Sequence, residues 1–466
     1  MSTALRAGAW YTVGNILIKG VSFFSIPIFT HLLLPDEYGS YNVFMSYASI
    51  ATIMFGLAIH VSLKNAKYDF NGEFEYFSST CCLLVVLVAS CAFFVLFFLR
   101  LFYVLPLSWF FIFFLCVEGF CQALSVYYNS YLSLSYRTRP YLFISLFYAV
   151  TSVVLSVLFI RTGIMGKRSD DRILGTVIPN MLIASYILFS FRKNIRVKEF
   201  RRYCAYGLAI SVPLLPHAFS QVILGQFDRM MISSMDSFYN AGIYSFAANI
   251  SGILSVIAAS FDTAWTTWFF GKMAGGDYAC IKAHSRVYLL LFSILAAGLL
   301  FVSPEIVVLL APEKYQDARY IVIPLVASVF LAFAYYLPSG IEYFLKKTAF
   351  ISMGTVGAAL LNVLLNYFFI KNFGYGAAAF TTLFCYLCYF LFHMIIAGRL
   401  MGSGKLREIL DCPFILLAVC AVLAMAFVSF FFVDSPVVRW GAMLAFCGTG
   451  GMYLILEFKR IRGIWR

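Results

Sequence analysis

The stretch that decides the fold runs from Phe77 to Leu99 and reads FSSTCCLLVVLVASCAFFVLFFL. It holds no charged residue, and it is long enough for a transmembrane helix, which needs about 20 mainly apolar residues. Its middle, Leu83-Leu84-Val85-Val86-Leu87-Val88, does not alternate apolar with polar side chains as a strand of a membrane barrel would. Because backbone groups in lipid need local hydrogen bonds, we predict a membrane-spanning helix here.

The same pattern recurs along the whole chain. Of its 466 residues, 62% are apolar or aromatic and 12% are charged, with a mean hydropathy of +0.88. Ordinary soluble domains are about half apolar and about a quarter charged. We therefore exclude a soluble enzyme and predict an all-α polytopic membrane protein with about fourteen transmembrane helices. These are expected at 8–33, 40–62, 77–99, 107–134, 140–160, 173–191, 205–235, 242–264, 287–310, 319–345, 348–370, 374–398, 413–433 and 437–457.

The basic residues set the expected orientation. The chain has 34 Lys and Arg against 21 Asp and Glu, a net charge of +13 that in a soluble chain would indicate nucleic-acid binding. Here the basic residues lie mainly between apolar segments. With the N-terminus inside, inner loops and tails hold 23 of the 34. The positive-inside rule then places both termini in the cytoplasm, with no nucleic-acid partner expected. The outer loop with Arg161, Lys167, Arg168 and Arg172 runs against the rule.

Neither metal binding nor an export signal is expected. The twelve cysteines lie mainly in apolar segments, and Cys385 and Cys388 form a C-x-x-C inside a predicted helix. Buried thiols are the favoured interpretation there, with a redox or zinc pair as the alternative. The first apolar segment is long and carries Lys19 in its middle, which indicates an uncleaved first helix rather than a signal peptide.

The chain also repeats itself. Pro35 to Tyr41 and Phe238 to Tyr244 both end in Gly-x-Tyr, at an offset of 203 residues. Arg137-Thr138 matches Lys347-Thr348, and the helix that ends at Gly163 matches the one that ends at Gly374. We predict two six-helix bundles, 1–191 and 204–400, joined by a basic cytoplasmic linker, 192–203. Residues 401–466 would add two helices and a basic tail. An even helix number keeps the repeats parallel, about an axis along the membrane normal.

Two packed halves with a crevice between them form a transporter layout, although a duplication that merely built a large bundle is the alternative. Several ordered motifs resemble the polysaccharide transporter family of the multidrug/oligosaccharidyl-lipid/polysaccharide exporter superfamily, which includes the O-antigen flippases. These motifs are Ile26-Pro27-Ile28-Phe29-Thr30, Leu34 to Gly39, Gly207-x-x-x-Ser211-x-Pro213-Leu214-x-Pro216, Asp228-Arg229, Phe261-x-x-Ala264-Trp265, Tyr315-x-x-Ala318 and Phe373-Gly374-x-Gly376-Ala377-Ala378.

The resemblance implies a function and a location. A protein of this family would turn undecaprenyl-pyrophosphate-linked oligosaccharide across the bacterial inner membrane by alternating access, for O-antigen, capsule or exopolysaccharide. It would need no cofactor, and H⁺ or Na⁺ coupling is an expected energy source beside substrate supply. Expected partners are membrane lipids, the polysaccharide polymerase and the chain-length machinery.

A pyrophosphate cannot cross hydrocarbon unaided, so the protein must offer fixed cations. Lys19 lies about eleven residues into the first helix, hence about 16 Å deep. Arg229 has a fork geometry that suits phosphate, and His217 could titrate near neutral pH. The alternatives are a structural ion pair or snorkelling for Lys19, an ion pair for Arg229, and packing for His217.

Other residues are candidates for sugar contact, movement and ion coupling. Tyr127 and Tyr131 could stack on sugar rings, with packing as the alternative. Pro213 and Pro216 should kink their helix and could form a hinge. Buried carboxylates can load and release a proton, and the candidates for ion coupling are Glu118, Asp228 and Asp262. Glu118 could have Lys19 as a partner across the bundle, and Asp262 could instead cap a helix end.

Two other classes of function remain open. A drug/cation antiporter of the same superfamily would have a cavity dominated by carboxylates and aromatic residues, which Lys19 and Arg229 argue against. A membrane-bound polysaccharide polymerase would need a long outer loop with catalytic residues, and the outer loops here are short. Because no nucleophile–base constellation or phosphate-binding glycine loop is found, we do not expect an enzyme.

Overall fold

The computed structural model describes residue 14 and residues 20–102 and 108–464, with side chains described as far as 455. Within these ranges the regular structure is helical throughout, as predicted. After a helix at Gly20–Leu32 come α2 Pro35–Gly56, η1 Ile59–Val61, α3 Leu63–Asp69, α4 Phe74–Leu101, α5 Trp109–Leu134, α6 Thr138–Thr162, α7 Arg168–Phe191, η2 Arg192–Asn194, η3 Val197–Glu199, α8 Phe200–Ser211, η4 Val212–Leu214 and α9 Leu215–Met235.

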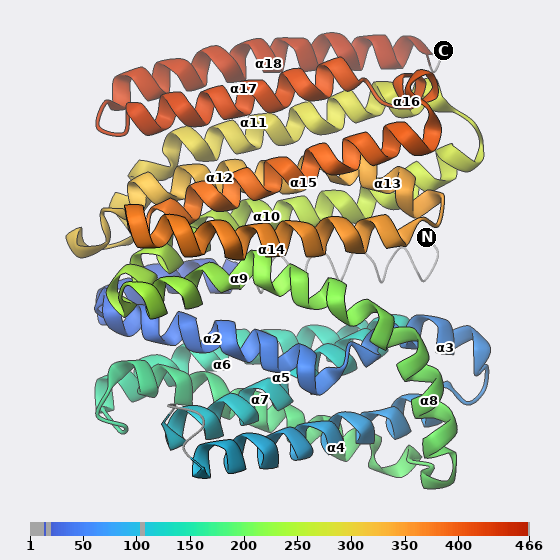
Figure 1. The fold of residues 1–466 in the computed structure, drawn as a ribbon, viewed down its shortest axis with the longest axis vertical. Helices are drawn as coiled ribbons and strands as arrows, with labels where there is room; N and C mark the ends of the chain where they lie inside the picture. The colour runs from blue at the N-terminus through green and yellow to red at the C-terminus, as the bar shows by residue number, and fades with distance from the viewer. Residues whose placement is uncertain (1–13, 15–19, 103–107, 465–466) are drawn as a thin grey trace. The chain divides into compact units, whose positions relative to one another are not determined.

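The second half is built from longer helices. These are α10 Phe238–Ala274, α11 Tyr278–Leu310, η5 Glu313–Tyr315, α12 Ala318–Ala334, α13 Tyr336–Phe344, α14 Thr348–Phe373, α15 Ala377–Met401, α16 Ser403–Ile409, α17 Cys412–Phe431 and α18 Pro436–Ile464. Figure 1 shows all of them in order along the chain.

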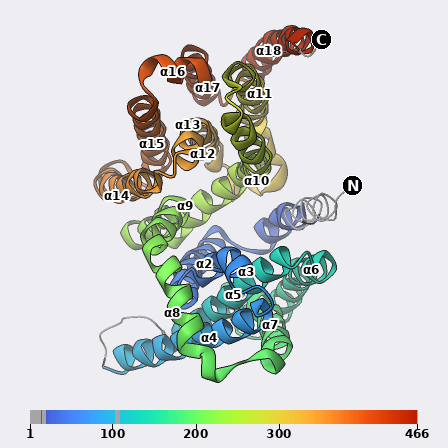
Figure 2. The ribbon, with the colours of Figure 1, turned by 90° about the vertical axis from the view of Figure 1, so that its right-hand side faces the viewer.

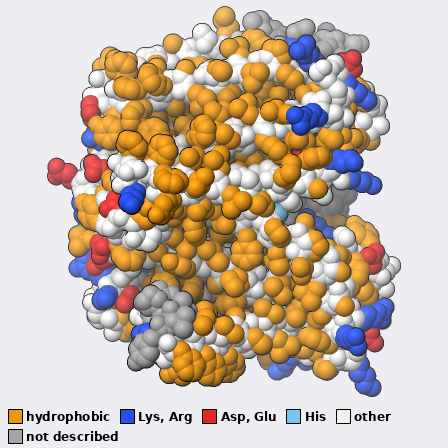
Figure 3. All heavy atoms as spheres, viewed as in Figure 1, with side chains coloured by type: hydrophobic (Ala, Val, Ile, Leu, Met, Phe, Trp, Pro, Cys, Tyr) orange, Lys and Arg blue, Asp and Glu red, His pale blue; other side chains and the backbone are white. Residues whose placement is uncertain are grey.

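The protein is a multi-pass membrane protein. Among the described residues, 11 helices are long and apolar enough to cross a membrane, or up to 12 if the bent pair Pro35–Gly56 and Ile59–Asp69 is one span. The predicted number of fourteen is therefore not confirmed, and the predicted first helix, 8–33, lies partly outside the described residues. On the face drawn in Figure 3, hydrophobic side chains cover the middle of the helices and charged side chains gather near helix ends, as lipid contact requires.

Contacts divide the chain into two compact units, residues 1–233 and 234–466. In the first, α6 packs along α7 and α2 along α5. The α8 segment belongs to this unit because Tyr203 and Tyr206 pack edge-on against Phe70 and Phe77 of the first bundle. The sequence assigned residues from 204 onward to the second bundle, and those bundle boundaries stay a prediction.

In the second unit, α10, α11, α12 and α15 form the centre, and α17 and α18 pack against α11. Figure 2 views most of these helices end-on, with α17 and α18 beside α11. Arg439 of α18 donates to both carboxylate oxygens of Glu305 on α11, at 2.6 and 2.8 Å. Asp411 pairs with Arg286 near the other end of α11. The two appended helices are thus fixed at both ends of α11.

The two halves share unusual turns at matching positions. Tyr136 and Lys346, 210 residues apart, are both non-glycine residues in the left-handed region, with φ of 55° and 59°. The next amides, of Arg137 and Lys347, each donate over 2.9 Å to the carbonyl five residues earlier. This geometry begins α6 and α14 in the same way, which supports the repeat that the sequence indicates.

Candidate functional site

The helix predicted at 205–235 is broken where its prolines lie. The α8 helix ends at Ser211, η4 spans Val212–Leu214, and α9 begins at Leu215. Pro213 and Pro216 have no N–H to offer the carbonyls four residues earlier, which ends regular α-helix here. Figure 1 shows α8 and α9 meeting at a bend. A bend at this point is what the sequence led us to expect; movement about it stays a prediction.

Two predicted charges lie together on α9 and are buried. Asp228 is 4% exposed and Arg229 is 8% exposed. Arg229 Nη1 donates to Gln226 Oε1 at 2.8 Å, and Ser46 of α2 donates to the same oxygen at 3.4 Å. Arg229 is thereby held toward α2 inside the first unit. His217 lies half-buried in the first turn of α9.

Glu118 lies at the centre of a buried polar cluster between α5, α7 and α2. It is fully buried, and its Oε1 accepts hydrogen bonds from Asn180 Nδ2 at 2.7 Å and Gln122 Nε2 at 2.8 Å. Thr52 of α2 donates to Gln122 Oε1 at 3.0 Å. Among the described residues, Glu118 Oε2 has no hydrogen-bond partner. Two amides therefore solvate one oxygen of this carboxylate, and no described residue donates to the other.

The two tyrosines expected to contact sugar lie in the packed interior of the first unit. Tyr127 is 1% exposed and donates to the Ser78 carbonyl at 2.8 Å. Tyr131 is 4% exposed, stacks on Phe74 and donates to Glu75 at 3.4 Å. Their ring faces are covered in this conformation, so sugar contact stays a prediction that requires the helices to part.

The remaining predicted residues are dispersed. Lys19 lies outside the described residues, so its pairing with Glu118 stays a prediction. Asp262 is half-buried on α10 of the second unit and accepts a 3.1 Å hydrogen bond from Thr266. The structure therefore brings Asp228 and Arg229 together but places Asp262 in the other unit. Within the described ranges, no group of three or more His, Cys, Asp or Glu could hold a metal ion.

A further charged residue, Arg172, was missed as a buried group. The sequence counted it among the charges of an outer loop, but it is the fifth residue of α7 and is 8% exposed. Its guanidinium is 3.8 Å from the centre of the Tyr41 ring, 3.9 Å from Phe29 and 4.9 Å from Tyr38. Burial among these rings removes Arg172 from the loop that opposes the positive-inside rule. The burial of Arg172 could have been predicted only if the start of this helix had been placed before residue 172.

The second unit holds a buried pair that the sequence did not connect. Glu342 of α13 and His393 of α15 are both fully buried, with Oε1 and Nδ1 2.7 Å apart. Each is a titratable residue inside a predicted apolar helix, and the two helices run in the same direction. Their similar positions along these helices were the signal in the sequence that they could meet, although 51 residues separate them.

A surface pair lies where α10 meets α11. A shallow pocket there is lined by Thr267, Trp268, Gly271, Lys272, Gly275 and Asp277. Asp277 accepts from the Cys280 amide at the start of α11, and Lys272 Nζ lies 2.7 Å from its Oδ2. The hydrogen bond from the Lys272 ammonium holds the pKa of the Asp277 carboxyl below its ordinary value. The Lys272–Asp277 ion pair therefore stabilises the turn that connects α10 to α11.

Comparison with solved structures identifies the fold. The chain matches a Lipid II flippase MurJ in an inward closed conformation with a TM-score of 0.64 and 16% identity, over 94% of this chain and 100% of that one. It matches an inward-facing multidrug resistance MATE family transporter of the MOP superfamily with a TM-score of 0.64 and 12% identity, over 84% and 98%. The fold is therefore that of MOP superfamily transporters, as the resemblance implied.

Comparison with known sequences identifies the family. Two Haemophilus influenzae proteins, one of the Lsg locus and one described as an uncharacterized membrane protein, are 22% and 25% identical over 258 and 259 residues. Each match spans 52% of this chain and less than two thirds of the relative, 64% and 63%. The family model described as "Polysaccharide biosynthesis protein" matches residues 4–273, more than half of the chain. The chain therefore belongs to the polysaccharide biosynthesis protein family.

Proposed function

We propose that this protein is a flippase that moves undecaprenyl-pyrophosphate-linked oligosaccharide units, for O-antigen or a related surface polysaccharide, across the bacterial inner membrane by alternating access. The observation that carries the proposal is the match to the polysaccharide biosynthesis family over residues 4–273. It is joined to a fold that a Lipid II flippase adopts over 94% of this chain.

Buried cations in the first unit support an anionic substrate. Arg229 and Arg172 lie in segments of mainly apolar helices and are each 8% exposed. An arginine at such depth is costly unless it has partners or a function. A guanidinium can bind a phosphate through two parallel N–H groups. Arg229, near the C-terminal end of α9, is our first candidate for pyrophosphate contact, with Lys19 as the second.

The test deletes the gene and locates the glycolipid. If the protein is the flippase, the lipid-linked intermediate accumulates in the inner leaflet and surface polysaccharide is lost. Leaflet position can be measured by treating intact spheroplasts with a glycosidase that cannot enter, then repeating the treatment after lysis. Normal surface polysaccharide together with altered drug resistance would overturn the proposal.

Arg229 provides the first site prediction. Arg229→Gln should lower flipping in proteoliposomes by about tenfold to a hundredfold, since a hydrogen bond to a charged group contributes about 1.5–3 kcal/mol. Arg192→Gln is the matched control, because Arg192 is exposed in the linker after α7. Membrane insertion should be unchanged in both. Equal flipping by the two variants would remove Arg229 from the substrate path.

An antiporter of drugs or cations is the second candidate. It is favoured by the fold shared with a multidrug resistance MATE transporter at a TM-score of 0.64. Overexpression would then raise the minimal inhibitory concentration of cationic drugs, and deletion would leave surface polysaccharide intact. The family match to polysaccharide biosynthesis ranks this candidate below the flippase.

The setting of the protein is part of the proposal. We place it in the inner membrane with both termini in the cytoplasm, beside the polysaccharide polymerase and chain-length machinery. The many apolar helices support a membrane location, and the basic loops support the orientation. Energy would come from substrate supply or from an H⁺ or Na⁺ gradient.

A further inference from the structure

The Glu342–His393 pair combines complete burial with direct contact. Both side chains have no exposed surface, and His393 Nδ1 lies 2.7 Å from Glu342 Oε1. Glu342 is on the short helix α13 and His393 is on α15, which pack side by side. The pair therefore links two elements of the second unit through a titratable contact in an apolar interior.

A break in the helix places Glu342 where it is. The α12 helix ends at Ala334 and α13 begins at Tyr336. Pro338 has no N–H for the carbonyl of Ala334, so the regular hydrogen-bond ladder is interrupted just before the pair. Glu342 thus sits on the short helix α13, which continues from α12 after one irregular residue, Tyr335. Its packing on α15 is set by the contact with His393.

Aromatic rings and one glycine enclose His393. The Tyr389 ring centre lies 4.6 Å from the imidazole and the Tyr335 ring 5.5 Å away. On α14, a Cβ added to Gly354 would lie 2.9 Å from His393 Nε2. The missing side chain lets the α14 backbone approach this nitrogen. Within the described part of the chain, Nε2 and the second carboxylate oxygen of Glu342 have no hydrogen-bond partner.

The charge of the pair depends on one proton. When Glu342 is ionised and His393 is neutral, the contact needs a donor, so Nδ1 carries the hydrogen and Nε2 has a lone pair. In that state a negative charge is buried without a cation, which is unfavourable in an apolar interior. A proton added to Nε2 makes an imidazolium–carboxylate pair with no net charge. No other bond forms or breaks, and the proton comes from water.

Titratable side chains surround the pair on several of the packed helices. Tyr335 and Tyr343 come from the α12–α13 segment and Tyr389 from α15, whereas α14 contributes the backbone of Gly354. Tyr336 of α13, Tyr288 of α11 and Asp262 of α10 interact with one another and reach the pair through Tyr343. The cations Lys346 and Lys347 follow α13 but are exposed. Tyr343 lies within electrostatic range of both Glu342 and Asp262.

We propose that Glu342 and His393 form a proton-binding site whose loading couples the packing of α13 on α15 to a proton gradient. Two side chains suit a proton, and among the described residues no third His, Cys, Asp or Glu joins them as a metal ligand would. Histidine is the side chain that changes charge between about pH 5 and 8. The binding of the proton stands by itself, whereas the coupling to transport rests on the proposed function.

Proton binding is tested on the purified full-length protein. With ¹⁵N-labelled histidine, one imidazole signal that is absent in His393→Gln should change when the pH is scanned over about 5–8, the range in which histidine ordinarily changes charge. Glu342→Gln should alter that signal and leave the others. His31→Gln is the matched control, because His31 is exposed on the helix Gly20–Leu32. A wild-type His393 signal that stays constant over this range overturns the site, with no variant needed.

Coupling is tested in proteoliposomes that carry undecaprenyl-pyrophosphate-linked oligosaccharide. An imposed pH gradient should speed wild-type flipping, and Glu342→Gln should reduce that stimulation by about tenfold while flipping without a gradient continues. Glu313→Gln, at an exposed site, is the control. Undiminished stimulation in Glu342→Gln refutes the coupling alone. If wild type moves no glycolipid under any gradient, the proposed function fails, and the histidine titration still decides the proton site.

Discussion

Glu118 illustrates what a buried carboxylate requires at the scale of single residues. Its position in mid-helix pointed to a charged partner, and the described neighbours are instead the amides of Asn180 and Gln122. Amides donate hydrogen bonds without cancelling the charge. This carboxylate can thus be held in place and still remain open to an arriving cation or proton.

Asn180→Ala should destabilise the first unit by about 1–3 kcal/mol, because a buried acceptor loses a donor. The measurement is thermal unfolding of the purified protein in detergent. Ser185→Ala is the control, since Ser185 is exposed on the same helix and bonds only within it. The double variant Glu118→Gln with Asn180→Ala should lose less than the two single losses together. If Asn180→Ala unfolds like Ser185→Ala, the amide is not supporting Glu118.

At the candidate site, burial could be predicted where a charged residue interrupts an apolar segment. Asp228 and Arg229 are neighbours in an apolar segment, so their burial was expected. Glu342 and His393 are joined by folding alone, across α13 and α15. Arg172 looked like a loop residue because aromatic rings from other segments cover it. Which side chains meet depends on how each helix is rotated about its own axis, and a uniformly apolar segment does not determine that rotation.

At the scale of elements, the left-handed turns before α6 and α14 allow a direct test of backbone strain. Lys346 has φ of 59°, and a left-handed residue with a side chain costs about 1–2 kcal/mol. Lys346→Gly should therefore raise the free energy of unfolding by up to about 1 kcal/mol, after the added backbone entropy of glycine. Lys347→Gly, next in the chain at φ of −93°, should give no gain. Equal effects of the two changes would show that the turn is not strained.

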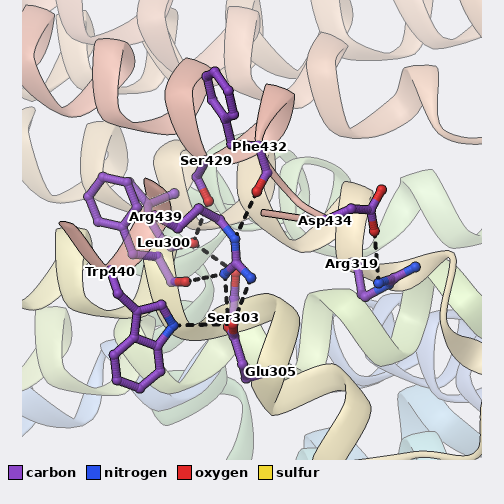
Figure 4. Close-up of polar contacts among 10 residues, drawn as sticks. Leu300, Ser303, Glu305, Arg319, Ser429, Phe432, Asp434, Arg439 and Trp440 are labelled. Atoms are coloured by element: carbon purple, nitrogen blue, oxygen red, sulfur yellow. Dashed lines mark hydrogen bonds and ion pairs between the residues drawn. The ribbon is translucent and has the colours of Figure 1, made fainter. Parts of the chain in front are cut away.

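The attachment of α18 to α11 gives a second prediction. Arg439 is 2% exposed and bonded to Glu305, to the Phe432 carbonyl and to the Phe301 carbonyl (Figure 4). Glu305→Gln should cost up to about 3 kcal/mol, since a buried guanidinium loses its carboxylate. Asp434→Asn, which affects the exposed pair with Arg319, should cost below about 1 kcal/mol. Calorimetry or thermal melting separates them, and similar losses would contradict the buried pair.

The turn between α10 and α11 should respond to acid. The pKa of Asp277 is lowered by Lys272, so its stabilising effect is complete above the ordinary carboxyl range and is lost as pH falls through the lowered value. Below about pH 4, Asp277→Asn should therefore show less loss of melting temperature than wild type. Asparagine keeps the helix cap, so Asp277→Ala should be less stable at every pH. An unchanged acid profile in Asp277→Asn would exclude the pair as its cause.

For the whole molecule, the orientation is the prediction to test first. Alkaline phosphatase fused after Gly166, before α7, should be active outside the cytoplasm. Green fluorescent protein fused after Asn194, beyond α7, should fluoresce inside, because basic residues follow α7. Fusions that report the same side would show that α7 does not cross the membrane. Reversed sides would overturn the predicted orientation.

The overall architecture was accessible from composition because hydrocarbon permits little except helices. The repeat was readable from its turns, Arg137-Thr138 and Lys347-Thr348, and the structure gives both the same geometry. The number of membrane-spanning helices was harder to predict from the sequence. The segment predicted at 40–62 bends by 59° near Leu57 and Ala58, both in the left-handed region. Apolar length alone cannot distinguish a straight span from a bent pair.

The anchoring of α17 and α18 also has a practical consequence. The Asp411–Arg286 and Arg439–Glu305 ion pairs fix this hairpin at both ends of α11. We therefore expect α17 and α18 to move together with α11. A spectroscopic label on this hairpin would then report the motion of the second unit from a distance. Val437, at the start of α18, is 86% exposed and offers an attachment point remote from the Glu342–His393 pair in the sequence.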